Sequence, residues 1–118
     1  MQLGHIELFV GDALAARRFY TRVLGFELVM EQGEAFTWLK SGGTELLLRP
    51  GNPESTPAGY ALAPVGFVLY TSDLSAELER LAGLGVSCQA MPGEPDCYVF
   101  SDLDGHWFQL VNPGEHVG

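Results

Sequence analysis

Cysteine is scarce in this chain of 118 residues, with only Cys88 and Cys97 present. Their spacing of nine positions matches no usual zinc-binding pair. A hairpin that turns near Pro92 and Gly93 would place the two side chains roughly opposite each other, so a disulfide is geometrically feasible. In a reducing compartment two such cysteines serve instead as packing thiols, and this is the state we expect.

Basic residues are also few, since six lysines and arginines face fifteen acidic residues and the formal net charge is −9. Such a charge repels nucleic acid and anionic lipid and mildly attracts cationic ligands. We therefore expect no nucleic-acid partner and no membrane partner. The acidity is equally explained by solubility alone.

Long apolar runs are absent, because no stretch of about eighteen apolar residues occurs. The opening "MQLGHIELF" lacks the basic and then apolar pattern of a secretory signal. We therefore expect a cytoplasmic protein. A hydrophobic content of 47% at this length predicts one domain over residues 1–118. The P-loop, dinucleotide and G-x-S-x-G nucleophile motifs are missing too.

The chain contains an internal repeat, which is the clearest signal of its architecture. "HIELFVGDALAARRFYTRVLGFEL" (5–28) and "GFVLYTSDLSAELERLAGLGVSCQ" (66–89) share a strand, an aspartate, an amphipathic helix, a glycine and a second strand. Asp12 and Asp73 are placed to cap the two helices, Gly25 to end the first, and Gly83 or Gly85 to end the second. Each helix has an apolar stripe. The stripes consist of Ala16, Phe19, Tyr20, Val23 and Leu24, and of Leu74, Leu78, Leu81 and Ala82.

Two further strand-like runs follow in each copy, around the turns "SGG" and "DLDG". The predicted layout is module one over 1–50, a linker over 51–64 rich in proline and glycine, and module two over 65–114. The fold class is α+β, with two tandem βαβββ modules. Each module leaves one face of its sheet uncovered, so the two curved mixed sheets can enclose a cavity.

Alternation along the first strand puts Ile6, Leu8 and Val10 under the helix and His5, Glu7 and Phe9 on the open face. A carboxylate among apolar neighbours needs a partner, and for Glu7 the candidates are Arg49, His5, solvent or a cationic ligand. Arg49 could instead clamp a ligand carboxylate.

Aromatic side chains are plentiful around the predicted cavity. By alternation Trp107 shares a face with Gln109 and Tyr70 shares one with Gly66, so these two aromatic residues are the best candidates for cavity walls. The other aromatic candidates are Phe9, Phe36, Trp38 and Tyr98. His106, directly after "DLDG", is expected to be a turn residue.

The strings "HIELFVGDALAARRFYTRVLGF" and "FSDLDGHWFQLVNP" resemble the opening and closing patterns of the vicinal oxygen chelate superfamily. This superfamily includes glyoxalase I, bleomycin-resistance proteins and extradiol dioxygenases, and the resemblance covers essentially the whole chain. It implies the paired βαβββ fold. It also implies a divalent metal (Zn, Ni, Mn or Fe) held by one ligand from the first strand and one from the last strand of each module.

The resemblance carries over to this chain position by position. His5 matches the first ligand position. Leu47 stands where a glutamate is expected, with Glu45 on the same face but two residues early. Gly66 matches the third position and has no side chain, while Gln109 matches the fourth, where glutamate is usual. Hard or borderline divalent ions need three or more well-placed donors.

Three functions remain open at this stage. The leading hypothesis is a metal-independent homodimer similar to the bleomycin-resistance branch, which sequesters an aromatic or cationic small molecule. Its ligand-binding residues would be His5, Glu7, Phe9, Trp38, Arg49, Tyr70, Trp107 and Gln109.

The alternative is a metal-dependent glyoxalase-type lyase or isomerase, or a dioxygenase. His5, Glu45 and Gln109 would then hold the metal, and Glu7 or Glu45 would be the catalytic base. The third possibility is an interaction module whose cavity is filled by its own side chains.

Overall fold

The computed structural model describes residues 1–52 and 56–114, in two compact units. Unit one is Met1–Thr56 and unit two is Pro57–Gly118, and each is described by itself. Pro53, Glu54 and Ser55 of the predicted linker lie outside the described residues.

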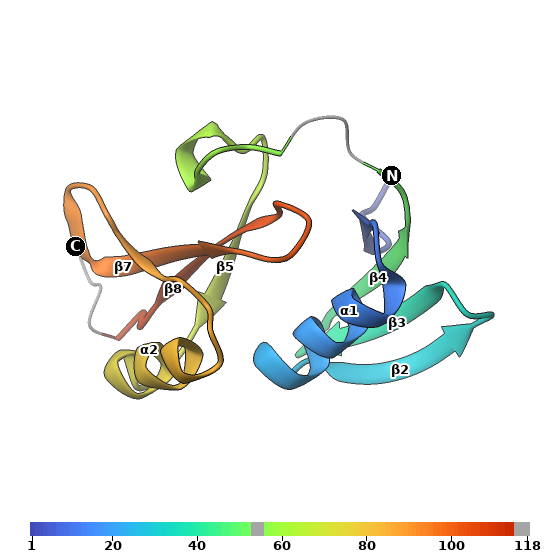
Figure 1. The fold of residues 1–118 in the computed structure, drawn as a ribbon, viewed down its shortest axis with the longest axis horizontal. Coiled ribbons are helices and arrows are strands. Elements are labelled where there is room, and N and C mark those ends of the chain that lie inside the picture. The colour runs from blue at the N-terminus through green and yellow to red at the C-terminus, as the bar shows by residue number, and fades with distance from the viewer. Residues whose placement is uncertain (53–55, 115–118) are drawn as a thin grey trace. The chain divides into compact units, whose positions relative to one another are not determined.

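Unit one is a βαβββ module (Figure 1). Its elements are β1 (Ile6–Val10), α1 (Ala13–Arg18), the π-helix η1 (Phe19–Val23), β2 (Glu27–Gln32), β3 (Phe36–Ser41) and β4 (Thr44–Pro50). The strand order is β1-β4-β3-β2, with β1 parallel to β4 and the other pairs antiparallel.

Unit two repeats this plan after a short 3-10 helix, η2 (Tyr60–Leu62), which lies within the predicted linker. Its elements are β5 (Gly66–Tyr70), α2 (Leu74–Gly83), β6 (Gln89–Met91), β7 (Glu94–Ser101) and β8 (Trp107–Val111). The order β5-β8-β7-β6 is the same as in unit one, again with one parallel pair, β5 with β8. The predicted tandem βαβββ fold is confirmed.

The two helices begin and end where the sequence predicts. The Asp12 carboxylate accepts from the Ala15 N–H at 3.0 Å, and the Asp73 carboxylate accepts from the Ala76 N–H at 3.1 Å. Gly25 (φ +75°) and Gly85 (φ +82°) take the left-handed conformation just after each helix. The repeat in the sequence is therefore a repeat in local structure.

Two details of the helices differ from the prediction. The first helix is not uniform, because after Arg18 it widens into a π-helix in which the Leu24 N–H donates to the Phe19 carbonyl at 3.1 Å. Within it the adjacent side chains of Phe19 and Tyr20 are both buried, 8% and 0% exposed. In α2, Ala82 is exposed, since Leu81 already takes the buried position of that turn.

In each unit the strand residues that face the helix supply part of the core. In unit one Leu8 and Val10 are buried, together with their neighbours on β3 and β4, as alternation predicts. In unit two the rings of Phe100 and Phe108 stack at 5.4 Å. Burial of this face fixes the register, so the remaining alternate side chains are directed to the opposite, open face.

Cys88 and Cys97 are both in the thiol form and are not joined by a disulfide. β6 and β7 do form the predicted hairpin, with Met91 paired to Glu94 around a turn where Gly93 has φ +80°. Cys88, however, precedes the first residue of β6, and Cys97 is fully buried. No helix within residues 1–52 and 56–114 is long and apolar enough to cross a membrane.

Candidate functional site

The open face of unit one brings together side chains from β1, β3 and β4. In the sheet register Glu7 lies opposite Leu47, Leu47 lies opposite Trp38, and Phe9 lies opposite Arg49. Residues opposite one another project to the same face. The register therefore places residues distant in sequence side by side.

Glu7 has both carboxylate oxygens engaged. Arg49 Nη1 donates to Oε1 at 2.7 Å, and His5 Nε2 lies 2.8 Å from Oε2. The hydrogen bond from Arg49, followed by that with His5, lowers the pKa of Glu7 below its ordinary value of 4.5. Glu7 is thus ionised, and its charge is neutralised by Arg49. The prediction that this carboxylate needs a partner is confirmed, since both candidate residues, Arg49 and His5, contact it.

The Arg49 guanidinium is also placed against two aromatic rings. Its Cζ lies 5.6 Å from the centroid of Phe9 and 5.5 Å from that of Phe36, which is within the range of cation–π attraction. Its Nε is buried and has no hydrogen-bond acceptor among the residues that the structure describes. The arginine is therefore held by cation–π contacts as well as by its ion pair with Glu7.

The Trp38 ring packs beside these residues through its contact with His5. His5 meets Trp38 edge to face at 4.7 Å between centroids, and the indole N–H donates to Gln32 Oε1 at 3.0 Å. We call the whole set the Glu7 cluster. Its members are His5, Glu7, Phe9, Phe36, Trp38 and Arg49. Phe36 was not among the predicted ligand-binding residues, although its alternation with Trp38 puts it on the same face.

In unit two the open face is different. Gly66 lies opposite Trp107 and Val68 lies opposite Gln109. The Trp107 indole N–H donates to the Pro57 carbonyl at 2.8 Å, so its polar end is used to hold the chain before β5. Tyr70 has the predicted position at the end of β5 and is 74% exposed.

Tyr60 is a residue of this face that sequence reasoning missed. A Cβ built on Gly66 would lie 2.5 Å from the Tyr60 hydroxyl oxygen and 2.7 Å from Cζ, so the phenol covers this glycine. Tyr60 comes from the linker, where no strand or helix periodicity indicates which way a side chain points. The available signal was an aromatic residue in a stretch that otherwise consists of proline, glycine, small or polar residues and one leucine, Leu62.

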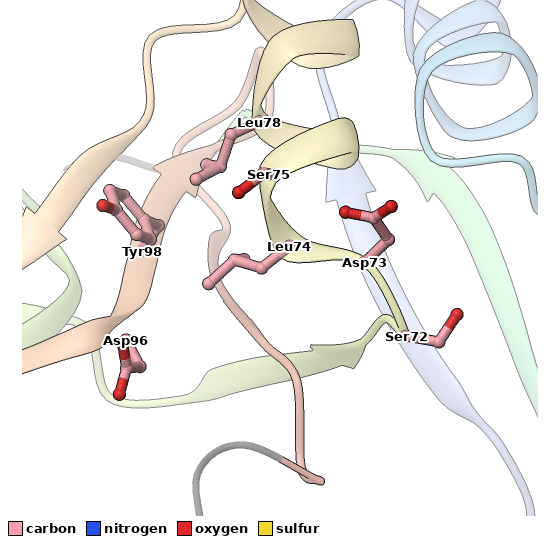
Figure 2. Close-up of a pocket in the computed structure, with 7 residues that line it drawn as sticks. All are labelled: Ser72, Asp73, Leu74, Ser75, Leu78, Asp96 and Tyr98. Atoms are coloured by element: carbon pink, nitrogen blue, oxygen red, sulfur yellow. The ribbon is translucent and has the colours of Figure 1, made fainter.

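A separate pocket of about 460 Å³ lies on the helix side of unit two (Figure 2). Leu74 and Leu78 of α2 point toward the strand that carries Tyr98, and Asp96 follows along that strand. The lining is completed by Ser72, Asp73 and Ser75. The Asp73 carboxylate is already used as the cap of α2. None of the predicted site residues belongs to this pocket.

Comparison with known proteins decides the family. The sequence model of the Glyoxalase/Bleomycin resistance protein/Dioxygenase superfamily matches residues 2–110. The chain belongs to this superfamily. No curated protein matches the sequence significantly.

Several solved structures share this superfamily fold. The fosfomycin resistance protein FosX from Listeria monocytogenes, in complex with Mn(II) and sulfate, has a TM-score of 0.77 at 18% identity, over 94% of this chain and 89% of that one. Lactoylglutathione lyase from Agrobacterium tumefaciens has a TM-score of 0.68 at 20% identity, over 100% and 98%. TnmS3, an antibiotic binding protein from Streptomyces sp. CB03234, has a TM-score of 0.69 at 26% identity, over 95% and 98%.

The side chains at the superfamily's four metal positions fit a metal poorly. The strand registers support the sequence alignment, because Glu7 opposite Leu47 corresponds to Val68 opposite Gln109. Leu47 is thus an apolar, 5% exposed residue at a ligand position. Among the described residues, no three His, Cys, Asp or Glu side chains gather as a metal site would require.

Two further contacts work against a metal at the remaining positions. His5 Nε2 is already within hydrogen-bond distance of Glu7, and Gly66 is covered by Tyr60. Glu45 is exposed on β4, opposite Lys40. The roles predicted for His5, Glu45 and Gln109 as ligands and for Glu7 or Glu45 as a base stay predictions.

Proposed function

We propose that this protein binds an aromatic small molecule on the open face of unit one, without a metal, and acts by sequestration. The observation that carries the proposal is the double engagement of Glu7 by Arg49 and His5. Because both carboxylate oxygens have partners, the face offers aromatic surface around a neutralised ion pair. The Glu7 carboxylate is therefore not free to act as a base or to bind a cation.

The exposed rings of the Glu7 cluster support an aromatic guest. Phe9 is 47% exposed, and Phe36 and Trp38 are partly exposed beside the apolar Leu47. Stacking of aromatic rings adds about 0.5–1.5 kcal/mol per pair beyond the burial of area. The net charge of −9 disfavours an anionic guest, so a neutral or cationic aromatic compound fits best.

The comparison with TnmS3 supports the same conclusion, because that protein binds an antibiotic and is 26% identical over 95% of this chain. We further infer a homodimer. β2 is an edge strand of the unit-one sheet, and Leu28, Val29 and Met30 on it are exposed. Exposed apolar edge strands favour pairing with a second chain. Sedimentation velocity on the purified protein tests this point, and a monomer at micromolar concentration would contradict it.

The binding proposal is tested by fluorescence. A Trp107→Phe variant leaves Trp38 as the single tryptophan, so quenching reports on the Glu7 cluster alone. Titration with metal-free bleomycin and with a neutral anthraquinone should quench Trp38. The matched variant Trp38→Phe, which keeps Trp107, should respond much less. The absence of quenching by either compound in the Trp107→Phe variant would refute the proposed site.

Elemental analysis of the purified protein separates this function from the metal-dependent alternative. The proposal expects less than about 0.1 equivalent of Zn, Ni, Mn or Fe per chain, because the donors are incomplete. A stoichiometric metal that is lost in His5→Ala together with a lyase or dioxygenase activity would favour the enzyme.

A further inference from the structure

The starting observation is the contact between the linker and β5 in unit two. The phenol of Tyr60 fills the space that a side chain at position 66 would occupy, with the hydroxyl oxygen, Cζ and Cε2 at 2.5, 2.7 and 2.9 Å from the Cβ position. Distances below about 3 Å do not occur for real Cβ contacts. A side chain at position 66 would therefore have to displace the Tyr60 phenol.

The backbone conformation does not explain the glycine. Gly66 is absent from the glycines with positive φ, unlike Gly25, Gly85 and Gly105. It lies in a regular strand and pairs in register with Trp107. A residue with a side chain could adopt this conformation without strain. The tight contact at this position is therefore with the Tyr60 phenol, which any larger residue would have to displace.

The linker segment that carries Tyr60 is held against the unit-two sheet. Trp107 fixes the Pro57 carbonyl at 2.8 Å. The 3-10 turn is closed by the Leu62 N–H to the Gly59 carbonyl at 3.1 Å and by the Ala63 N–H to the Tyr60 carbonyl at 3.2 Å. η2 also contacts β7 and β8. These contacts give the phenol a defined position over the first residue of β5.

We propose that the Tyr60 phenol fills the space at position 66, where the superfamily pattern has a metal ligand. It thereby keeps a divalent cation from binding on this face of unit two. In the superfamily pattern this unit would supply one metal ligand at position 66 and another at position 109. In this chain the phenol of the linker residue Tyr60 occupies the space at position 66, and position 109 is a glutamine. The inference rests on the part of the proposed function that says no metal is bound. It adds a steric reason why unit two does not bind one.

The test restores both donors of unit two with and without the phenol. One variant carries Gly66→His and Gln109→Glu, and a second adds Tyr60→Ala. Both are titrated with Zn²⁺ alone by isothermal calorimetry, beside the wild type and Tyr60→Ala. With Tyr60 in place, affinity should stay within about threefold of the wild type. With Tyr60→Ala it should rise at least about tenfold, because the two side-chain donors on one face can then hold the ion together with water ligands that complete its coordination.

Adding Leu62→Ala in place of Tyr60→Ala is the matched control, because Leu62 lies in the same 3-10 turn and is 72% exposed. It should leave the affinity of the two-donor variant unchanged. Equal Zn²⁺ affinity with and without Tyr60, or an equal gain from Leu62→Ala, would overturn the proposal.

A second measurement covers variants that fold poorly. Gly66→Ala should lower the urea midpoint in the wild-type background and leave it unchanged in Tyr60→Ala. Equal shifts in both backgrounds would also overturn the proposal. Neither result depends on aromatic-ligand binding at the Glu7 cluster, so the two proposals fail separately.

Discussion

Glu7 and Arg49 are 42 residues apart in sequence, yet their side chains meet at 2.7 Å on the open face of unit one. The parallel register of β1 and β4 accounts for this contact, because it sets Phe9 opposite Arg49 and Glu7 opposite Leu47. The Arg49 side chain can then reach the Glu7 carboxylate, which belongs to the next pair on the same face of the sheet. A single strand register thus produces the charge neutralisation on which the proposed site depends.

The first prediction concerns pH. The pKa of Glu7 is lowered in the folded chain by Arg49 and His5, so its ionised form stabilises the fold above the ordinary pKa of 4.5. That stabilisation is lost as the pH falls through the lowered value, where the carboxylate becomes protonated. Glu7→Gln should therefore lower the urea midpoint at about pH 7, and lower it less as the pH falls below 4.5, for example at about pH 3. An equal effect at both values would show that the charge is not responsible.

The second prediction concerns Arg49 and Phe9. Because the guanidinium lies 5.6 Å from the Phe9 centroid and the arginine side chain is 38% exposed, the attraction should be that of a partly solvated cation–π pair. A double-mutant cycle with Arg49→Met and Phe9→Leu should give a coupling free energy of about 0.5–1 kcal/mol. The cycle is measured by urea unfolding. A coupling indistinguishable from zero would mean that the stacking does not stabilise the fold.

Much of this face could be predicted from the sequence because strand alternation is regular. Burial of Leu8 and Val10 fixes which side of β1 faces the helix, and His5 and Glu7 then have to lie on the other side. The need of a carboxylate for a partner pointed to Arg49 and His5. The capping aspartates were predictable for a similar reason, since a cap acts through local hydrogen bonds.

Tyr60 and the π-helix show where that reasoning ends. Tyr60 lies in a linker with no period, so its contact with Gly66 depends on tertiary packing that no local pattern encodes. The widening after Arg18 is a hydrogen-bond pattern in which the Leu24 N–H donates to the Phe19 carbonyl. The α-helical pattern predicts the same buried side chains, Phe19 and Tyr20, with or without this widening, so the sequence periodicity does not reveal it.

The third prediction concerns the two thiols. Burial raises the pKa of Cys97 and also that of Cys88, which lowers the thiolate fraction of both. Cys97 is 0% exposed whereas Cys88 is partly exposed, so the two thiols should differ in how fast a reagent reaches them. Under native conditions a thiol reagent should label Cys88 at least about tenfold faster than Cys97. Mass spectrometry of the labelled peptides measures the rates, and both sites should react equally in denaturant.

The last prediction concerns the turn between β7 and β8. The Asp102 side chain is 1% exposed, and its Oδ1 accepts from the Asp104 N–H at 2.9 Å and the His106 N–H at 2.8 Å. Its Oδ2 lies 2.7 Å from His106 Nδ1. Asp102→Ala would leave two turn N–H groups without their acceptor, so it should lower the free energy of unfolding by about 2–3 kcal/mol.

Asp102→Asn keeps one carbonyl oxygen for the two backbone donors and should therefore lose less than Asp102→Ala. Leu103→Ala is the matched control, because Leu103 lies in the same turn and is 64% exposed. Urea unfolding of the three variants tests the order of stabilities. If Leu103→Ala destabilises the protein as much as Asp102→Ala, the turn is held by packing and not by the hydrogen bonds of the buried carboxylate.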